Sequence, residues 1–207
     1  FSLTPLALDV FEAIKQAGGH VYLVGGCVRD FLLKRRSKDI DVEVHHLSFA
    51  ALKEVLSPFG TVQVMGAAFA VVHLSTLEGY EFALPRIEEK IGLKHQDFNV
   101  IVDPDLPLEK ACARRDFTIN SMLYDIETGT VIDFYSGQKD LKNGILRATN
   151  VEHFSEDPLR VLRGASFMSR YGFKMDPDTK NLCQSIVEEG GLDTLSIERI
   201  YTEYCKI

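Results

Sequence analysis

The residues best suited to chemistry lie in the first fifth of the chain. Gly25 and Gly26 stand between an apolar segment and a helical pattern, where backbone N–H groups can approach a phosphate. Asp39 and Asp41 follow, and residues two apart in a strand point to the same face, so their carboxylates lie side by side. Such a pair is costly unless a cation joins it, and Mg²⁺ is the usual partner. Together with Arg29, this order indicates a metal-dependent site for nucleotidyl transfer.

Two glutamates compete for the place of a third carboxylate. Glu81 lies in a predicted strand, GYEFAL, from which it can reach the same edge as the aspartates. Glu43 continues the face of Asp39 and Asp41 along their own strand. Glu81 fits an ordinary outward-facing strand glutamate nearly as well, and the sequence does not separate these interpretations.

A second constellation is RRDFTIN, which contains Arg114, Arg115, Asp116 and Asn120. Two adjacent cations at the start of a predicted helix are able to bind a triphosphate or a ribose. The same residues also suit a surface charge cluster.

A third constellation places Asp157 and Arg160 three residues apart, as neighbours on the surface of a predicted helix, with Arg163 one turn on. An ordinary ion pair within that helix would contribute only about 0.2–0.5 kcal/mol. A sharper interpretation follows because an aspartate only accepts hydrogen bonds and an arginine only donates them. The pair complements a base edge with an amino group beside a ring-nitrogen acceptor, which cytosine and adenine present. It would select CTP and ATP without a nucleic-acid template.

The first two constellations fall in a segment that alternates helices with short strands, up to about residue 135. HVYLV at 20–24 and IDVEV at 40–44 read as strands, and three more candidates lie within 61–84. The pattern predicts an α/β head with an antiparallel-looking sheet at 1–135.

From residue 136 onward the spacing is helical, and helices are predicted to begin near Pro158, at Asp176 and at Ser196. We expect a small, all-helical neck at 136–207. Its last helix offers an apolar face with little chain left to cover it, which indicates a truncated neck, part of a longer protein. The face consists of Ile197, Ile200, Tyr201 and Tyr204.

Composition narrows the possible classes. The 207 residues carry 23 Lys and Arg against 30 Asp and Glu, and this net charge of -7 excludes a uniformly basic nucleic-acid-binding protein but permits a local basic patch. No apolar run is long enough to span a membrane, and no signal peptide is visible. Four scattered cysteines fit neither a disulfide framework nor a zinc site, so we expect a reducing, cytoplasmic setting.

Taken together and in this order, the motifs resemble those of the class II tRNA nucleotidyltransferases, which add CCA, and of bacterial poly(A) polymerases. LVGGCVRDFLL…KDIDV is similar to their first catalytic motif, RRDFTINSM to their ribose-recognition motif and SEDPLRVLRGASF to their amino-acid template motif. IERIYTE matches their ERxxxE helix motif. The resemblance covers about residues 20–203 and implies a nucleotidyltransferase head of the DNA polymerase β type with a mixed sheet, followed by the helical neck.

The resemblance also implies roles for individual residues. Asp39 and Asp41 would ligate Mg²⁺, and Glu81 stands five residues before Arg86, where related enzymes carry an acid. The implied reaction is attack of a tRNA 3′-hydroxyl on the α-phosphate of CTP or ATP, with release of pyrophosphate. The positions implied to contact the nucleotide are Gly25, Gly26, Arg29, Arg115, Asp116, Asn120, Asp157, Arg160 and Arg163.

Other functions remain open beside CCA addition. Addition of only CC or only A, and poly(A) tailing, use the same motifs, although bacterial poly(A) polymerases tend to carry an arginine-rich stretch where this chain has MGAAFAVVHL. The segment 88–99 corresponds to a mobile loop that switches specificity in such enzymes. A catalytically silent RNA-binding fragment would not need the clustered carboxylates. A nucleotidyltransferase for small molecules or proteins would leave the Asp157–Arg160 pair unexplained.

The chain departs from the family pattern in two places. Lys34-Arg35-Arg36 follows Leu-Leu, where the family usually has a glycine, and EKACA replaces an acidic pair before RRD. Family members also carry further helical domains that grip the tRNA body. Because the chain ends where those domains would begin, we expect an intact catalytic head with poor RNA affinity.

Overall fold

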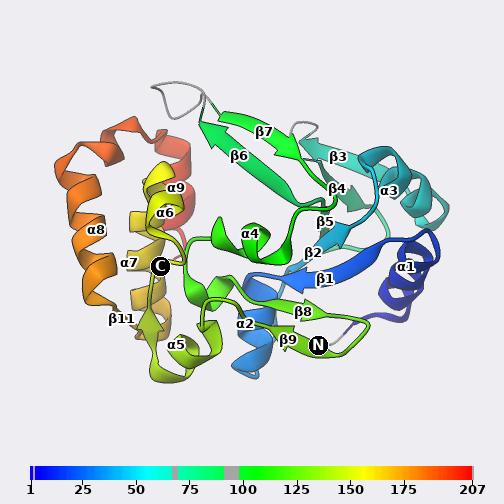
Figure 1. The fold of residues 1–207 in the computed structure, drawn as a ribbon, viewed down its shortest axis with the longest axis horizontal. Coiled ribbons are helices and arrows are strands. Elements are labelled where there is room, and N and C mark those ends of the chain that lie inside the picture. Colours follow the sequence, from blue (N-terminus) through cyan, green and yellow to red (C-terminus); the bar gives the residue numbers. More distant parts are fainter. Residues whose placement is uncertain (2, 67–69, 91–97, 207) are drawn as a thin grey trace.

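A computed structural model gives the structure of residues 1, 3–66, 70–90 and 98–206. Its central feature is a seven-stranded sheet with the order β3-β4-β5-β2-β1-β8-β9 (Figure 1). The strands are His20–Val24 (β1), Ile40–His45 (β2), Val62–Gly66 (β3), Val71–Leu74 (β4), Tyr80–Ala83 (β5), Leu123–Asp125 (β8) and Thr130–Ile132 (β9).

The sheet is mixed, which confirms the expectation from the resemblance and corrects the antiparallel pattern expected from the strand spacing. β2 and β5 pair in parallel, whereas their neighbours in the sheet pair antiparallel. A parallel pair needs a long crossover connection. The helix α3 (Phe49–Leu56), a short 3₁₀ turn (Ser57–Phe59), β3 and β4 supply that crossover between β2 and β5.

One face of the sheet carries most of the hydrophobic core. At the start of the helix α1 (Pro5–Gln16), the Thr4 hydroxyl accepts from the Ala7 N–H at 3.2 Å and Pro5 stands in the first turn. It packs with α3 and brings Phe11 against the ring of Phe82, with 6.5 Å between the ring centroids. This packing holds β1, β2 and β5 in fixed positions, and these strands carry or adjoin the predicted site residues.

The opposite face has a second, smaller apolar cluster. Tyr22, Val24 and Leu123 are buried there with Cys112, which lies on the helix α4 (Leu108–Ala113). The sequence pattern did not predict α4, because six residues are too few to show helical periodicity. This helix matters for function because the segment that follows it carries Arg114, Arg115 and Asp116.

A two-stranded antiparallel hairpin, β6 (Arg86–Lys90) and β7 (Phe98–Val102), forms a separate small sheet. Its strands occupy both ends of the predicted mobile segment 88–99. Of the two segments compared with related enzymes, residues 67–69 and 91–97 lie outside the described residues.

The C-terminal part consists mainly of helices, as predicted. They are α5 (Gly137–Asn143), α6 (Val151–Glu156), α7 (Leu159–Tyr171), α8 (Pro177–Glu188) and α9 (Ile197–Tyr204), with a 3₁₀ turn at Gly191–Thr194. The expectation of an all-helical neck needs one correction, because β10 (Ile145–Leu146) pairs in parallel with β11 (Lys174–Met175). Two-residue strands leave no periodic signal in a sequence.

The last helix confirms its predicted apolar face. Ile197, Tyr201 and Tyr204 are each about 70% exposed on α9. At the other end of this part, α5 packs directly on the 3₁₀ turn Thr118–Asn120, so closely that a side chain at Gly137 would overlap the Thr118 carbonyl. A division between head and neck at residues 135 and 136 stays a prediction. Among the helices that the described residues form, none has both the length and the apolar character needed to cross a membrane.

Candidate active site

A cavity of about 900 Å³ lies where the head meets α7 and α9. Eleven of the twelve site residues predicted from the sequence line it, although they come from four separate segments of the chain. They are Gly25, Gly26, Arg29, Asp39, Asp41, Arg115, Asp116, Asn120, Asp157, Arg160 and Arg163. The twelfth, Glu81, lines an adjoining cavity of about 360 Å³ that it shares with Asp39 and Asp41.

Gly25 and Gly26 form part of the cavity wall. Gly25 adopts a φ of 71°, a left-handed conformation that favours glycine, and it immediately precedes the helix α2 (Gly26–Leu32). A Cβ atom there would lie 3.0 Å from an Arg115 guanidinium nitrogen and 3.4 Å from an Asp41 carboxylate oxygen. Glycine is therefore needed both for the turn and for the close approach of these two charged side chains.

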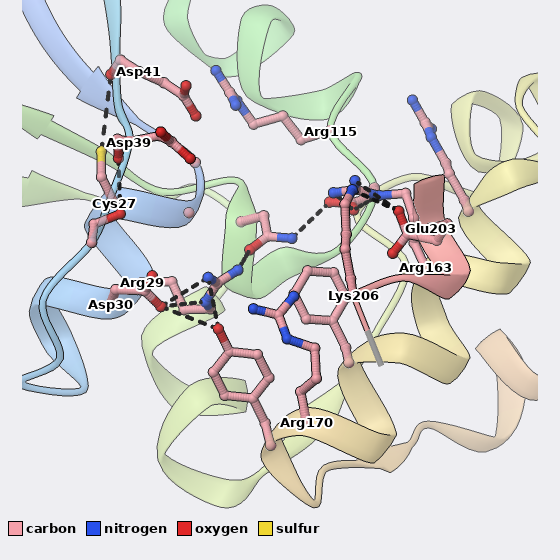
Figure 2. Close-up of a pocket in the computed structure, with 18 of the residues that line it drawn as sticks. Cys27, Arg29, Asp30, Asp39, Asp41, Arg115, Arg163, Arg170, Glu203 and Lys206 are labelled. Atoms are coloured by element: carbon pink, nitrogen blue, oxygen red, sulfur yellow. Dashed lines mark hydrogen bonds and ion pairs between the residues drawn. The ribbon is translucent and has the colours of Figure 1, made fainter. Parts of the chain in front are cut away.

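The carboxylates gather at the end of the parallel strand pair. Asp41 on β2 is the register partner of Glu81 on β5, and Asp39 lies one residue before β2. Burial raises the pKa of Asp41; the charge of Arg115 opposes this shift, and the charges of Glu81 and Asp39 add to it. Figure 2 shows the Asp41 carboxylate pointing toward Arg115 across the cavity. The site thus concentrates negative charge in a place that a cation would stabilise.

The two candidates for a third carboxylate have different surroundings. Glu81 is 48% exposed, lies beside Asp41 and contacts His73 at 3.2 Å. Glu43 is buried, and both of its oxygens are engaged, one by His45 at 3.0 Å and the other by Arg115 at 3.3 Å. Burial alone would raise the pKa of Glu43, but the hydrogen bond from His45 and the charge of Arg115 bring it below the ordinary value. Glu43 is therefore a carboxylate that serves its protein neighbours, and Glu81 is the acid open to the cavity edge.

Arg29 lines the cavity, but most of its side chain is buried. It is 6% exposed, donates to Asn120 at 2.7 Å and to Asp30 at 2.8 and 3.0 Å, and bonds the Tyr171 hydroxyl at 3.0 Å. Its guanidinium also lies 5.2 and 5.0 Å from the ring centroids of Phe167 and Tyr171. Arg29 thereby connects the helix α2 of the head to the helix α7.

Asp116 continues this connection. It accepts hydrogen bonds from Asn120 at 3.0 Å and from Arg163 at 2.7 and 2.8 Å. Burial would raise the pKa of Asp116, but the charge of Arg163 and these hydrogen bonds lower it below the ordinary value. Arg163 also lies 3.9 Å from Glu203 of α9, which binds Lys206 at 2.8 Å. The result is a continuous polar chain across the cavity, drawn from Arg29 to Lys206 in Figure 2.

The Asp157–Arg160 pair is not formed as a side-chain pair on one helix, which corrects the expectation from spacing. Asp157 precedes Pro158 and has extended backbone angles, because a proline disfavours the helical conformation of the residue before it. Its carboxylate binds Arg199 at 2.9 and 3.1 Å. Arg160 donates instead to the backbone carbonyls of His153 and Arg114, the latter at 2.6 Å. Both side chains line the cavity, but each is occupied by another partner.

Several cavity residues were not singled out as site residues from the sequence. Phe167, Arg170 and Tyr171 follow Arg163 at four, seven and eight residues, which is the spacing of one helix face and was the available signal. Arg35, Arg36 and Lys38 also line the cavity; the sequence shows them only as a basic run beside the site.

The donor set fits a magnesium ion. Among the described residues, no group of three or more His, Cys, Asp and Glu side chains is arranged to hold a metal. Asp39 and Asp41 are thus two carboxylates without a complete protein cage. Mg²⁺ is usually bound in this way, through one or two carboxylates with water and substrate phosphates in the other positions.

Comparisons with known proteins agree with this geometry. The profile of the family described as "Poly A polymerase head domain" matches residues 21–147. The multifunctional CCA protein of Acinetobacter baylyi is 45% identical over 188 residues, which are 88% of this chain and 43% of that protein. The protein of the same name from Pseudoalteromonas atlantica is 43% identical over 190 residues, or 90% of this chain and 45% of that protein. The chain thus spans less than half the length of these relatives.

Solved structures show the same fold. The Thermotoga maritima CCA-adding enzyme, solved in complex with tRNA, superposes with a TM-score of 0.78 and 29% identity, over 99% of this chain and 47% of that one. The Bacillus stearothermophilus CCA-adding enzyme, solved with CTP, gives the same TM-score and identity, over 99% of this chain and 49% of that one. The mixed sheet followed by helices is therefore the head and neck fold of CCA-adding enzymes. Since the profile also covers more than half of the chain, this chain belongs to the Poly A polymerase head domain family.

Proposed function

We propose that this chain is the catalytic part of a tRNA nucleotidyltransferase that adds C and A from CTP and ATP to the 3′ end of tRNA. The observation that carries the proposal is the meeting of Asp39 and Asp41 with Arg115 over Gly25, in one cavity with Asp157 and Arg160. Relatives named multifunctional CCA proteins and similar structures solved with tRNA, CTP and ATP support it. We place this activity in the cytoplasm.

The reaction joins the RNA 3′-hydroxyl to the α-phosphate and releases pyrophosphate. Nucleotidyltransferases of this kind generally depend on a metal, and Asp39 and Asp41 would hold Mg²⁺. When bound, the ion lowers the pKa of the 3′-hydroxyl and neutralises negative charge on the pyrophosphate leaving group. Arg115 lines the same cavity beside Gly25 and Asp41 and would bind triphosphate oxygens. Glu81 would extend the acidic edge beside Asp41.

Base selection by Asp157 and Arg160 requires a change of partners. A cytosine or adenine edge would replace Arg199 at Asp157 and the backbone carbonyls at Arg160. Both replacements exchange one hydrogen bond for another, so the difference in free energy is small compared with an unpaired buried charge. We expect Arg199→Ala to free Asp157 for the nucleotide and not to abolish base selection.

The proposal is tested by single-nucleotide extension with Mg²⁺, in which CTP, ATP, UTP and GTP are supplied separately. The primers are tRNAs that end at the discriminator base, at C and at CC. CCA addition predicts CTP incorporation on the first two primers and ATP incorporation only on the third. A Glu81→Gln variant in the same assay tests whether this acid takes part.

A second candidate, poly(A) tailing, is favoured by the family profile itself, which is described by that activity. Repeated ATP addition to all three primers would establish it in place of CCA addition. Intact CTP binding without incorporation on any primer would show that this chain cannot hold RNA by itself. Loss of both CTP binding and nucleotide incorporation would support the interpretation of the chain as a catalytically silent fragment.

A further inference from the structure

Three ionisable side chains lie along one face of β2. Asp41, Glu43 and His45 alternate with Val42 and Val44, whose side chains are buried on the opposite face in the main core. Exposure falls along the row, from Asp41 at the cavity to Glu43 at 6% and His45 at 2%. Glu43 and His45 are buried polar side chains, and burying such groups without partners is costly. A catalytic role for Asp41 alone does not account for their presence further along the same face of the strand.

Each buried member of the row has a partner. His45 Nε2 lies 3.0 Å from one oxygen of Glu43, and the His45 ring packs edge-on against Tyr22 with 5.2 Å between centroids. The other oxygen of Glu43 accepts from a guanidinium nitrogen of Arg115 at 3.3 Å. The row therefore runs from the core of the head to the cation beside Asp41.

Arg115 is fixed at one nitrogen and open at another. Its side chain is 21% exposed, and its second terminal nitrogen lies near Gly25 and Asp41. Within the described part of the chain, that nitrogen has no hydrogen-bond acceptor, and the Nε atom is buried without one. A guanidinium with a fork of donors suits phosphate oxygens, but only while its plane is held in place.

We infer that Glu43 is a positioning residue that holds the Arg115 guanidinium over Gly25 and beside Asp41, and that His45 holds Glu43. The inference rests on the proposed function, in which Arg115 binds the triphosphate of CTP or ATP. It also settles the competition with Glu81 in physical terms, since both Glu43 oxygens face protein donors. Glu43 acts on the nucleotide through Arg115 and not through the metal.

The test uses Glu43→Gln, which keeps the shape of the side chain and removes its charge. The matched control is Asp125→Asn on β8, which also removes a buried carboxylate bonded to a histidine, His20 at 3.0 Å, but one that does not contact Arg115. Calorimetric titration with CTP and with ATP, in EDTA and in Mg²⁺, gives dissociation constants that do not depend on activity. We expect E43Q to weaken both nucleotides about tenfold in either buffer and D125N to leave them unchanged.

A double-mutant cycle with Arg115→Lys separates positioning from other roles. If Glu43 acts through Arg115, the E43Q substitution changes the CTP dissociation constant less than twofold in the R115K background. Equal effects in both backgrounds would overturn the inference. So would a tenfold higher requirement for Mg²⁺ in E43Q with unchanged binding in EDTA, because that result would make Glu43 a metal ligand.

Steady-state extension adds a readout that a structural role would not change. We expect E43Q to raise the KM for CTP while the KM for the tRNA primer stays at the wild-type value, and Glu43→Asp to recover part of the loss. If E43Q does not fold, His45→Gln tests the same series of contacts, because His45 holds Glu43. We then expect the nucleotide dissociation constants to rise in the same way but by a smaller factor. Repeated ATP addition to every primer would refute CCA addition, and CTP binding without extension would show that the chain cannot hold RNA by itself. In both cases the binding test of Glu43 still decides the inference.

Discussion

A single buried carboxylate, Asp116, organises much of the cavity. Its two oxygens accept from the Phe117 N–H at 2.7 Å, from Asn120 and from two nitrogens of Arg163. Because the group is 7% exposed, it depends on these donors for the solvation that water would otherwise provide. The geometry of Arg163 and Asn120 follows from this one residue, so its role toward a nucleotide would be exerted through them.

We predict that Asp116→Asn lowers the free energy of unfolding by about 3 kcal/mol at pH 7, because Arg163 loses its buried partner. The pKa of Asp116 is lower in the folded protein than in the unfolded chain. Its stabilisation is therefore present above the unfolded pKa and is lost as the pH falls through the folded one. Urea unfolding at pH 7 and near pH 3 measures both effects. Asp105→Asn, at an exposed pair with His46, is the control and should cost under about 0.5 kcal/mol.

Asp41 should show the opposite effect on stability. Its pKa is raised by burial, so the ionised form destabilises the folded protein at pH 7. We predict that Asp41→Asn abolishes nucleotide incorporation and, in EDTA, raises the free energy of unfolding by about 0.5–2 kcal/mol. The gain should shrink as the pH falls through the raised pKa, where the native aspartate becomes protonated. A destabilised Asp41→Asn protein would contradict the assignment of Asp41 as a strained functional carboxylate.

At the scale of elements, the end of α2 shows the structural consequence of one departure from the family pattern, Lys34 in place of the usual glycine. Lys34 has a φ of 55°, and the Lys34 and Arg35 N–H groups bond back to Phe31 and Asp30 at 3.0 and 2.8 Å. This is the Schellman arrangement, in which the left-handed residue is usually glycine. Lysine at this position therefore carries backbone strain.

Replacing the strained residue should stabilise the protein. We predict that Lys34→Gly raises the free energy of unfolding by about 0.5–1 kcal/mol, since the relief of strain exceeds the added entropy of the unfolded chain. Gly172, at φ 68° after α7, is the reverse control: a Cβ there meets nothing within 4 Å, so Gly172→Ala isolates the backbone cost. The two substitutions should have opposite signs in urea unfolding. Equal signs would show that the backbone conformation is not the cause.

The sequence predicted those elements whose signals are local. Asp176 and Ser196 each cap a helix as expected, β2 follows from its alternation, and β1 follows from its short apolar run. The helix α4 and the strands β8 and β9 were not predicted from the sequence, because three to six residues contain too little periodicity. The hairpin was not predicted because its two strands, β6 and β7, are separated in the sequence by an intervening segment.

The same limit applies to the site. The motif spacing brought Asp39, Asp41 and Gly25 together correctly, because their proximity is set by one strand and one turn. It failed for Asp157 and Arg160, where Pro158 separates the residues into two elements. Contacts such as Glu43 with Arg115 join residues from distant segments, and they depend on how α4 packs on the sheet. No local pattern encodes that packing.

The charge of the whole molecule is distributed unevenly. The net charge is -7, yet exposed cations line the cavity and have no acidic partner among the described residues within 4.0 Å. They are Arg35, Arg36, Lys38 and Arg170. Arg35 and Arg170 lie 5.0 and 5.4 Å from the ring of Tyr171, which Arg29 also contacts. Cations gathered in this way on an acidic protein favour a polyanionic ligand at this edge.

We predict that a triple variant, R35Q/R36Q/K38Q, weakens tRNA binding and reduces the slope of log affinity against log salt by up to about 2, as expected for three lost phosphate contacts. The dissociation constant for CTP should stay near the wild-type value. Fluorescence anisotropy between 50 and 200 mM salt gives the slope. The control replaces Lys139, Lys142 and Lys180, which are exposed and outside the cavity. Loss of CTP binding in the first variant would instead assign this edge to the triphosphate.

The polar chain that runs from Arg29 through Asn120, Asp116 and Arg163 to Glu203 joins residues from nearly opposite ends of the sequence. A ribosome adds roughly 5–20 residues per second, so at least several seconds separate the synthesis of Arg29 from that of Glu203. During that interval, a nascent chain already contains both aspartates and the glycine turn but not the far wall of the cavity. The cavity is therefore complete only after Glu203 has been synthesised, because until then the nascent chain lacks the part of the wall that α9 supplies.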